Sequence, residues 1–243
     1  MSHPDWLVPD WPAPSHVRAF TTTRAGGVSE GEFASMNLGR HSGDAAERVT
    51  RNRAILRSFL PSAAPWLAQV HGTAVSNLDL PDRLERADAC LTHAAYRVAG
   101  VLTADCMPLL FTDNAGTVVA AAHAGWRGMA AGVIERTVDA LRVPPESVLA
   151  WMGPTIGPDA FEVGAEVREA FIEVDAHADS AFRAHAPGKF MADLYALARQ
   201  RLARAGVERV YGGGFCTFHE AERFFSYRRV KASGRMGSFI WRE

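Results

Sequence analysis

The sequence is poor in cysteine, in clustered charge and in long apolar runs. Only 3 of its 243 residues are cysteine and their spacing is irregular, which argues against a disulfide framework and predicts a reducing, cytoplasmic location. No apolar stretch reaches the roughly 18 residues of a membrane-spanning helix. The formal net charge is −1 with lysine and arginine scattered, so neither a nucleic-acid groove nor an anionic membrane face is expected.

The remaining bulk properties are those of an ordinary globular protein. Apolar residues make up 48% and charged residues 22%, and the chain is long enough for one or two domains. Residues 1–12 contain no basic or apolar signal region, so no secretory signal is predicted. Proline and glycine gather at 24–31, 153–158 and 211–214, which are predicted to be loops because patterned apolar segments flank each one.

Apolar patterning predicts interleaved strands and helices. Strands are expected at 17–22, 66–70, 98–103, 117–123, 147–152, 207–211 and 238–241. Helices are expected at 44–60, 129–141, 164–173 and 191–205, the first with Asp44 as its N-cap. A hairpin connection is expected at 111–116. Hairpins mixed with alternating strands and helices favour an α+β or mixed α/β domain over a regular parallel arrangement.

Three side chains stand out because each lies at or just beyond the end of a predicted strand: His71, Cys106 and His123. Two imidazoles and a thiolate form a ligand set for a tetrahedral metal such as zinc, and three protein ligands leave one position open for water or substrate. Arg127 and the start of the following helix would add donors for an anion. The alternative is core histidines and an inert buried cysteine, since no CxxC or HExxH element is present.

Other residues are weaker candidates. Asp105 would accept a hydrogen bond from an imidazole, act as a base, or serve only as a turn carboxylate at a strand end. Arg228 and Arg229 would clamp a phosphate or carboxylate, or form a solvated basic end. Cys90 and Cys216 are predicted to be structural.

Several short motifs occur in the order found in a known family. They are Gly26–Ser29, Ser35–Gly39, Gln69–Gly72, Ala87–Ala89, Thr103–Pro108, His123–Gly128, Gly153–Gly157 and Phe224–Arg229. With them the chain resembles the YfiH-like family, also named the laccase-domain or polyphenol oxidase family. Its bacterial members are called purine nucleoside phosphorylases or peptidoglycan editing factors. The resemblance runs from about residue 17 to residue 242.

The resemblance implies a fold, a metal and several activities. The fold is a single mixed α/β/β/α domain over residues 1–243, distantly similar to the catalytic domain of cytotoxic necrotizing factor. The metal is zinc, held by His71, Cys106 and His123. The family's activities are phosphorolysis of adenosine, inosine, guanosine and methylthioadenosine, deamination of adenosine, oxidation of polyphenols, and removal of misincorporated L-serine from a peptidoglycan precursor.

The histidine content argues against the multicopper chemistry that the laccase name implies. A multicopper oxidase needs a His₂Cys copper site and a cluster with many further histidines, usually in His-x-His pairs. The chain has 9 histidines and no such pair, so a full multicopper centre is not expected. A single copper ion at the His71, Cys106 and His123 site is still compatible, since copper outcompetes zinc for such ligands.

The other activities place different demands on the same residues. Deamination would use the low pKa of zinc-bound water, with Asp105 or a neighbour as proton shuttle. Amide hydrolysis would use zinc or, without metal, Cys106 as nucleophile with a histidine base. Phosphorolysis would need a phosphate cradle and electrostatic stabilisation of the sugar cation. The candidates for substrate and phosphate binding are Arg24, Ser29, Asn37, Arg127, Arg228 and Arg229.

We therefore expect a cytoplasmic zinc enzyme that acts chiefly as a purine nucleoside phosphorylase, with adenosine deaminase side activity. The residues expected in catalytic roles are Cys106, His71, His123 and Asp105. Its partners would be a nucleoside and phosphate rather than nucleic acid or membrane, and a monomer is compatible with the sequence. The alternatives are a peptidoglycan-precursor amidase, a copper-dependent polyphenol oxidase, and a metal-binding protein without turnover.

Overall fold

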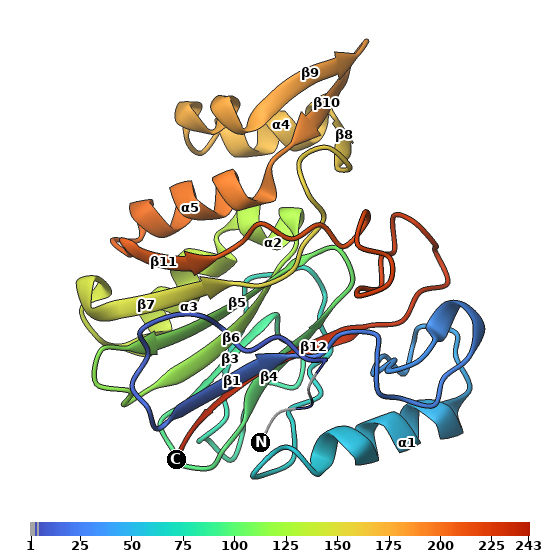
Figure 1. Cartoon of the computed structure of the whole chain (residues 1–243). Helices are drawn as coiled ribbons and strands as arrows, with labels where there is room; N and C mark the ends of the chain where they lie inside the picture. Colours follow the sequence, from blue (N-terminus) through green and yellow to red (C-terminus); the bar gives the residue numbers. More distant parts are fainter. Residues whose placement is uncertain (1–2, 4) are drawn as a thin grey trace.

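A six-stranded sheet forms the centre of the fold in the computed structural model, which describes residues 3 and 5–243 (Figure 1). Its strands are β2 (Val75–Asn77), β3 (Ala89–Thr92), β5 (Met107–Asp113), β6 (Val119–Ala124), β7 (Val148–Met152) and β11 (Arg209–Gly212). Their order across the sheet is β11-β7-β5-β6-β3-β2. The outer pairs are parallel and the inner pairs are antiparallel, so the sheet is mixed, as the sequence predicted.

A three-stranded antiparallel sheet packs against one face of the six-stranded sheet. Its strands are β1 (Val17–Thr21), β4 (Ala99–Thr103) and β12 (Met236–Arg242), in the order β1-β12-β4. Because side chains alternate along a strand, Leu110 of β5 faces this second sheet while Leu109 faces the other way. Leu110 shares an apolar cluster with Val101 and Ile240 of the second sheet. The two sheets therefore bury a common apolar layer between them.

Helices cover the outer face of each sheet. The six-stranded sheet is covered by α2 (Trp126–Ala131), α3 (Val133–Leu141) and α5 (Leu194–Arg204), and Ile134 and Leu197 join its apolar cluster. The three-stranded sheet is covered by α1 (Ala46–Arg57), whose Leu56 packs with Phe239 of β12. The layers are thus α/β/β/α, with α1 and α5 on opposite sides (Figure 1). The likeness to cytotoxic necrotizing factor stays a prediction.

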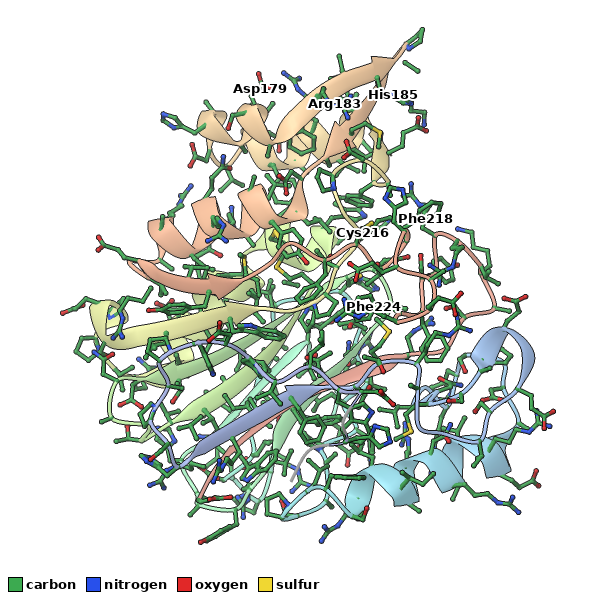
Figure 2. The ribbon with its side chains drawn as sticks, viewed as in Figure 1. Asp179, Arg183, His185, Cys216, Phe218 and Phe224 are labelled. Carbon is green, nitrogen blue, oxygen red and sulfur yellow. The ribbon has the colours of Figure 1, made fainter. Side chains whose placement is uncertain are left out.

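A smaller sheet extends the α5 side of the fold. It is formed by β8 (Glu162–Gly164), β9 (Phe182–Ala186) and β10 (Lys189–Ala192) in the order β8-β10-β9, with α4 (Ala165–Ile172) beside it. Three short 3₁₀ helices complete the described elements: η1 (Gly31–Phe33), η2 (Pro145–Ser147) and η3 (Ala176–Ala181). Figure 2 shows Arg183 and His185 of β9 at the outer end of this unit, far from Cys216 and Phe224.

Most of the predicted elements are confirmed. The strands expected at 17–22, 98–103, 117–123, 147–152, 207–211 and 238–241 are present, with ends within two residues of the prediction. The helices expected at 44–60 and 164–173 are present in shorter form, and β5 and β6 form the hairpin expected around 111–116. The three cysteines are free thiols. No helix in the described part of the chain is long and apolar enough to cross a membrane.

Two predictions about the strands and helices near the site are wrong. The segment 66–70 forms no strand, because the Gln69 side chain, rather than its backbone, pairs with the N–H and C=O of Leu102. The helix expected at 129–141 is broken at Gly132, whose left-handed φ of 102° ends α2 and begins α3. Short β2 and β3 escaped prediction because neither contains an alternating pattern of useful length.

Two helix starts also differ from the prediction. Residues 191–192 belong to β10, and α5 begins after Asp193, whose carboxylate accepts hydrogen bonds from two N–H groups of the first turn. Asp44 is not the N-cap of α1, since Ala45 occupies that position. The Asp44 carboxylate instead accepts hydrogen bonds from Ser29 Oγ and Asn37 Nδ2. Asp44 therefore joins two loops instead of capping the helix.

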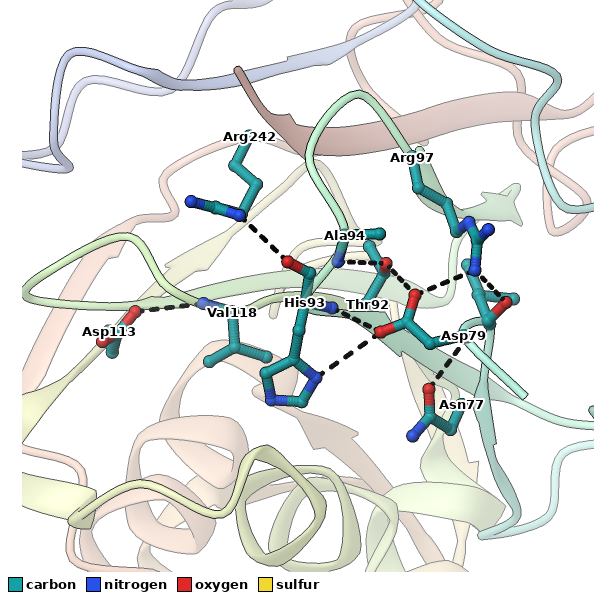
Figure 3. A network of polar contacts seen from close by, with 10 residues as sticks. Asn77, Asp79, Thr92, His93, Ala94, Arg97, Asp113, Val118 and Arg242 are labelled. Carbon is teal, nitrogen blue, oxygen red and sulfur yellow. Dashed lines mark hydrogen bonds and ion pairs between the residues drawn. The ribbon is translucent and has the colours of Figure 1, made fainter.

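Asp79 ties the loop after β2 to the end of β3 (Figure 3). Its carboxylate accepts hydrogen bonds from Thr92 Oγ1 at 2.6 Å, from the His93 N–H at 2.7 Å and from Arg97 at 2.9 Å. Burial alone would raise the pKa of this carboxyl. The three donors outweigh burial and hold the pKa below its ordinary value.

We expect Asp79→Asn to lower the free energy of unfolding by about 1–2 kcal/mol at neutral pH, because an amide loses these charge-assisted bonds. A carboxyl with a lowered pKa stabilises the fold above its unfolded pKa, near 3.9, and that contribution is lost as the pH falls through the folded value. Urea denaturation at several pH values checks this. A difference between the two chains that persists unchanged into strong acid would contradict the prediction.

Candidate metal centre

The three predicted ligand side chains lie together at one end of the six-stranded sheet. One donor atom from each of His71, Cys106 and His123 lies within 4.8 Å of the other two. The antiparallel pairing of β5 with β6 sets Pro108 opposite His123, which places Cys106, just before β5, beside this histidine. The ring centroids of His71 and His123 are 4.7 Å apart. The fold thus gathers an N, N, S donor set from three separate segments.

Asp88 is the organising carboxylate of this centre, and the sequence analysis gave it no role. It is fully buried just before β3. One oxygen, Oδ1, accepts from His123 Nδ1 at 2.8 Å and from the His71 N–H at 2.9 Å. The other, Oδ2, accepts from the Val70 and Gly72 N–H groups at 3.1 and 2.7 Å. Asp88 therefore fixes the ring of one histidine and the backbone of the loop that carries the other.

The loop that carries His71 is also held by Gln69. The side-chain amide of Gln69 donates to the Leu102 carbonyl at 2.7 Å and accepts from the Leu102 N–H at 2.8 Å. It thereby takes the place of a strand along the edge of β4. His71 itself has a left-handed φ of 59°, which is uncommon for a residue other than glycine and marks a tightly held turn.

Asp105 holds the turn before Cys106 rather than contacting an imidazole. Its carboxylate accepts hydrogen bonds from Thr217 Oγ1 and from the Arg228 N–H, both at 2.6 Å. Its backbone, at a left-handed φ of 84°, places its carbonyl to accept from the Ile156 N–H. The orienting role predicted for Asp105 is therefore filled by Asp88, and Asp105 positions the cysteine.

The surroundings of the centre act in opposite directions on the pKa values of its two histidines. Burial opposes protonation of His123, but the Cys106 sulfur and the Asp88 carboxylate outweigh burial and raise the pKa of His123 to about 9. His123 uses Nδ1 for Asp88, so its other ring nitrogen faces Cys106. Burial and the neighbouring His123 lower the pKa of His71. One imidazole is thus disposed to carry a proton and the other to be neutral in the absence of metal.

Gly125 leaves the space in which the donors meet. A Cβ atom at this position would lie 2.8 Å from both Cys106 Sγ and His71 Nδ1. Cβ atoms essentially never approach other heavy atoms this closely, so any larger residue would fill the space between the donors. The glycine of the His123–Gly128 motif is therefore explained by the centre itself, not by backbone freedom, since its φ is −68°.

The centre opens into a cavity of about 930 Å³. Arginine and aromatic side chains line it in pairs: Arg127 lies over the Trp126 ring at 4.4 Å, and Arg228 over Phe161 at 5.3 Å. Arg235 lies near the Tyr227 ring at 5.8 Å. Such surroundings suit a ligand with an aromatic part and a negatively charged part.

Comparison with known proteins shows the family to which the chain belongs. Residues 18–243 match the family described as multi-copper polyphenol oxidoreductase laccase. The chain belongs to this family. The resemblance noted from the sequence motifs is thereby confirmed. His71, Cys106 and His123 form one candidate metal centre. Within residues 3 and 5–243 they are the one group of three or more histidine, cysteine or carboxylate donors found close together.

Relatives of the laccase-family chain carry a different functional name. A Pseudomonas aeruginosa protein named purine nucleoside phosphorylase PA4543 is 55% identical over 97% of this chain and 98% of its own length. The Escherichia coli protein named purine nucleoside phosphorylase YfiH is also 55% identical, with the same shares covered. The crystal structure of Neisseria meningitidis NMB0706 matches with a TM-score of 0.94 at 50% identity, over 98% of this chain and 99% of that one.

The structure brings only some of the predicted substrate contacts of this laccase-family chain to the cavity. Arg127 and Arg228 line it, whereas four other predicted residues do not: Arg24, Ser29, Asn37 and Arg229. Arg24 donates to the Ala34 and Ala221 carbonyls, and Arg229 donates to three carbonyls between 217 and 224. These guanidinium groups hold loops together, a use of arginine that looks the same in sequence as anion binding.

The sequence analysis also missed three arginines of the cavity: Arg40, Arg53 and Arg235. Arg40 follows the Ser35–Gly39 motif, and Arg235 precedes β12. Arg53 lies in α1. No local pattern marks any of the three. Asp88 stands between two alanines in the Ala87–Ala89 motif, but its full burial, which marks it as a carboxylate with partners, is known only from the structure.

Proposed function

We propose that this chain is a zinc-dependent purine nucleoside phosphorylase with adenosine deaminase side activity. The observation that carries the proposal is the meeting of His71, Cys106 and His123 at an arginine-lined and aromatic-lined cavity. The names of the relatives support the nucleoside and phosphate as substrates. His71, Cys106 and His123 would act in catalysis as the metal ligands, and Asp105 would position Cys106.

The donor set fits zinc. Two imidazoles and a thiolate are ligands that zinc prefers, and bonds of about 2.0–2.3 Å require donors no more than roughly 4.5 Å apart. The donors lie within 4.8 Å of one another, close to this limit, and His71 is the exposed member of the set. The space left by Gly125 supports the same assignment. Zinc bound by three protein ligands would supply Lewis-acid chemistry at its open position.

The chain's own residues would orient the phosphate and the nucleoside. Arg127, Arg228 and Arg235 carry fixed positive charge into the cavity and would hold orthophosphate in position. The aromatic rings beside them would pack against the purine. In the reaction a phosphate oxygen bonds to ribose C1′ as the bond from C1′ to the purine nitrogen breaks, and the purine nitrogen takes up the proton that the hydrogen phosphate loses. The bound phosphate dianion stabilises the positive charge that develops on the sugar.

Purified chain incubated with adenosine, phosphate and zinc is expected to form adenine and ribose 1-phosphate, with a smaller amount of inosine. His71→Ala should reduce turnover by at least about 100-fold, because a metal ligand is lost. His219→Ala is the matched control, since His219 is exposed and does not line the cavity. A zinc-loaded chain that forms neither product would reject the proposal.

One observation favours amide hydrolysis as a second candidate function. Cys106, His123 and Asp88 stand in a line of nucleophile, base and orienting carboxylate, with 2.8 Å between His123 Nδ1 and Asp88 Oδ1. A zinc-bound thiolate is not a free nucleophile, so metal content separates the two functions. If the cysteine attacks, the metal-free preparation should release L-serine from a muramoyl precursor and the zinc-loaded preparation should not.

A further inference from the structure

The cavity carries more positive charge than the proposed reaction uses. Five arginines line it, and none of them forms an ion pair with a carboxylate in the described part of the chain: Arg40, Arg53, Arg127, Arg228 and Arg235. Asp105, the one acidic residue of the lining, already accepts hydrogen bonds from Thr217 and from the Arg228 backbone. The cationic charge of the wall is therefore left for a ligand to neutralise.

The five arginines fall into two groups. Arg127 stands four residues after His123 in the same motif, and the Arg228 N–H donates to the carboxylate of Asp105, the residue before Cys106. Arg235 lies near the ring of Tyr227, the residue before Arg228. These three arginines form a group beside the metal ligands, which the proposed orthophosphate would occupy. Arg40 and Arg53 instead also line a second hollow, whose lining includes none of the three metal-centre donors. They belong to a part of the cavity farther from the centre.

The distant group is built around the end of α1. The Arg53 guanidinium lies 3.6 Å from the centroid of the Trp66 ring, and its Nε and Nη2 both donate to the Leu38 carbonyl. This anchoring fixes the side chain and does not use Nη1. Burial, followed by repulsion from Arg40, lowers the pKa of Arg53 to about 10, a value at which it stays charged at neutral pH.

The cationic wall continues beyond the main cavity. A second hollow of about 250 Å³ shares Arg40, Arg53 and Trp66 with the first, adds Arg57, and has no acidic residue in its lining. The two hollows therefore adjoin at these three side chains, and the second lies against α1. A neutral nucleoside with one orthophosphate at the metal ligands would leave the second hollow without a negative charge.

We propose that Arg40, Arg53 and Arg57, with Trp66, form a second anion subsite that binds the phosphate groups of a purine nucleotide. The identity of the base and sugar at the metal end rests on the proposed function. Planar guanidinium groups pair with phosphate oxygens through two parallel hydrogen bonds, and a fixed arginine stacked on an indole presents such a pair without further ordering. The substrate class of the cavity thus extends from nucleosides to nucleoside 5′-phosphates and 5′-diphosphates.

Isothermal titration of the full chain with adenosine, adenosine 5′-diphosphate and inorganic pyrophosphate tests the subsite. Adenosine 5′-diphosphate should bind at least about tenfold more tightly than adenosine, as expected for charge-assisted contacts with phosphate. Pyrophosphate should compete with the diphosphate but not with adenosine. Equal affinities for adenosine and its diphosphate would overturn the proposal.

Two variants separate a built subsite from general attraction by charge. Arg40→Gln removes an exposed guanidinium and should weaken diphosphate binding about three- to tenfold while leaving adenosine binding unchanged. Arg51→Gln makes the same change in charge on α1, but Arg51 lines neither hollow, so binding should not change. Equal losses in both variants would overturn the proposal. Phosphorolysis of adenosine measured in parallel reports on the proposed function alone, because nucleotide binding that depends on Arg40 does not require turnover.

Discussion

A Gly125→Ala chain is expected to fold normally and yet lose metal binding and phosphorolysis. The added Cβ would lie 2.8 Å from Cys106 Sγ and from His71 Nδ1, so it occupies the space between the donors. The backbone tolerates alanine, since Gly125 has φ −68° and ψ 157°, an extended conformation open to every residue. Its carbonyl would still accept the hydrogen bond from the Met129 N–H. The site is thus blocked without loss of the helix that follows.

We expect turnover to fall by at least about 100-fold, because a displacement of about 1 Å in reacting groups has effects of that size. Metal analysis after zinc loading, thermal unfolding and the nucleoside assay measure the three properties separately. Gly72→Ala is the matched control. Gly72 lies in the His71 loop, but its Cβ would meet no atom closer than 3.5 Å and its N–H to Asp88 would remain. If Gly125→Ala leaves zinc content and turnover intact, the assignment of the metal centre to this donor set is rejected.

Most strands could be predicted because apolar patterning reports directly on burial, whereas the layers were implied only by the family resemblance. The continuous apolar run of β6 and the hairpin before it are examples of such patterning. It failed at 66–70, where an apolar segment lies beside a strand but is joined to it through the Gln69 side chain. Periodicity cannot distinguish a segment paired by its backbone from one tethered by an amide.

Candidate site residues were predictable where the motif itself carries the donor. His71 and His123 stand in short motifs with glycine and Cys106 stands in Thr103–Pro108, each at or just beyond the end of a predicted strand. These positions left a metal site and inert core residues as alternatives, and the family resemblance implied the metal site. The supporting residues were not predictable, because they depend on register. Asp88 reaches His123 because β3 and β6 pair with Ala89 opposite Ala122, a relation that no local pattern reveals. For the same reason, the sequence does not distinguish an arginine that lines the cavity, such as Arg53, from one that holds a loop, such as Arg24. Only the fold shows the difference.

Asp88→Asn is expected to weaken both the fold and the metal centre. In the native chain each carboxylate oxygen accepts two hydrogen bonds: Oδ1 from the His71 N–H and His123 Nδ1, and Oδ2 from the Val70 and Gly72 N–H groups. An amide keeps only one oxygen. Whichever way it turns, its NH₂ group faces two donors, so two of the four bonds become repulsive contacts inside a fully buried site.

The free energy of unfolding should fall by about 2–4 kcal/mol, the range for removing one partner of a buried charged network. Zinc affinity should fall by about 10- to 100-fold, because the ring of His123 and the loop of His71 lose their orientation. Urea denaturation and competition with a zinc chelator measure the two effects. Asp79→Asn is the control, since it removes a similar carboxylate from loops outside the cavity and should lower stability without changing zinc affinity. If Asp88→Asn is destabilised but binds zinc as tightly as the native chain, Asp88 supports the fold alone and the histidines are oriented by other contacts.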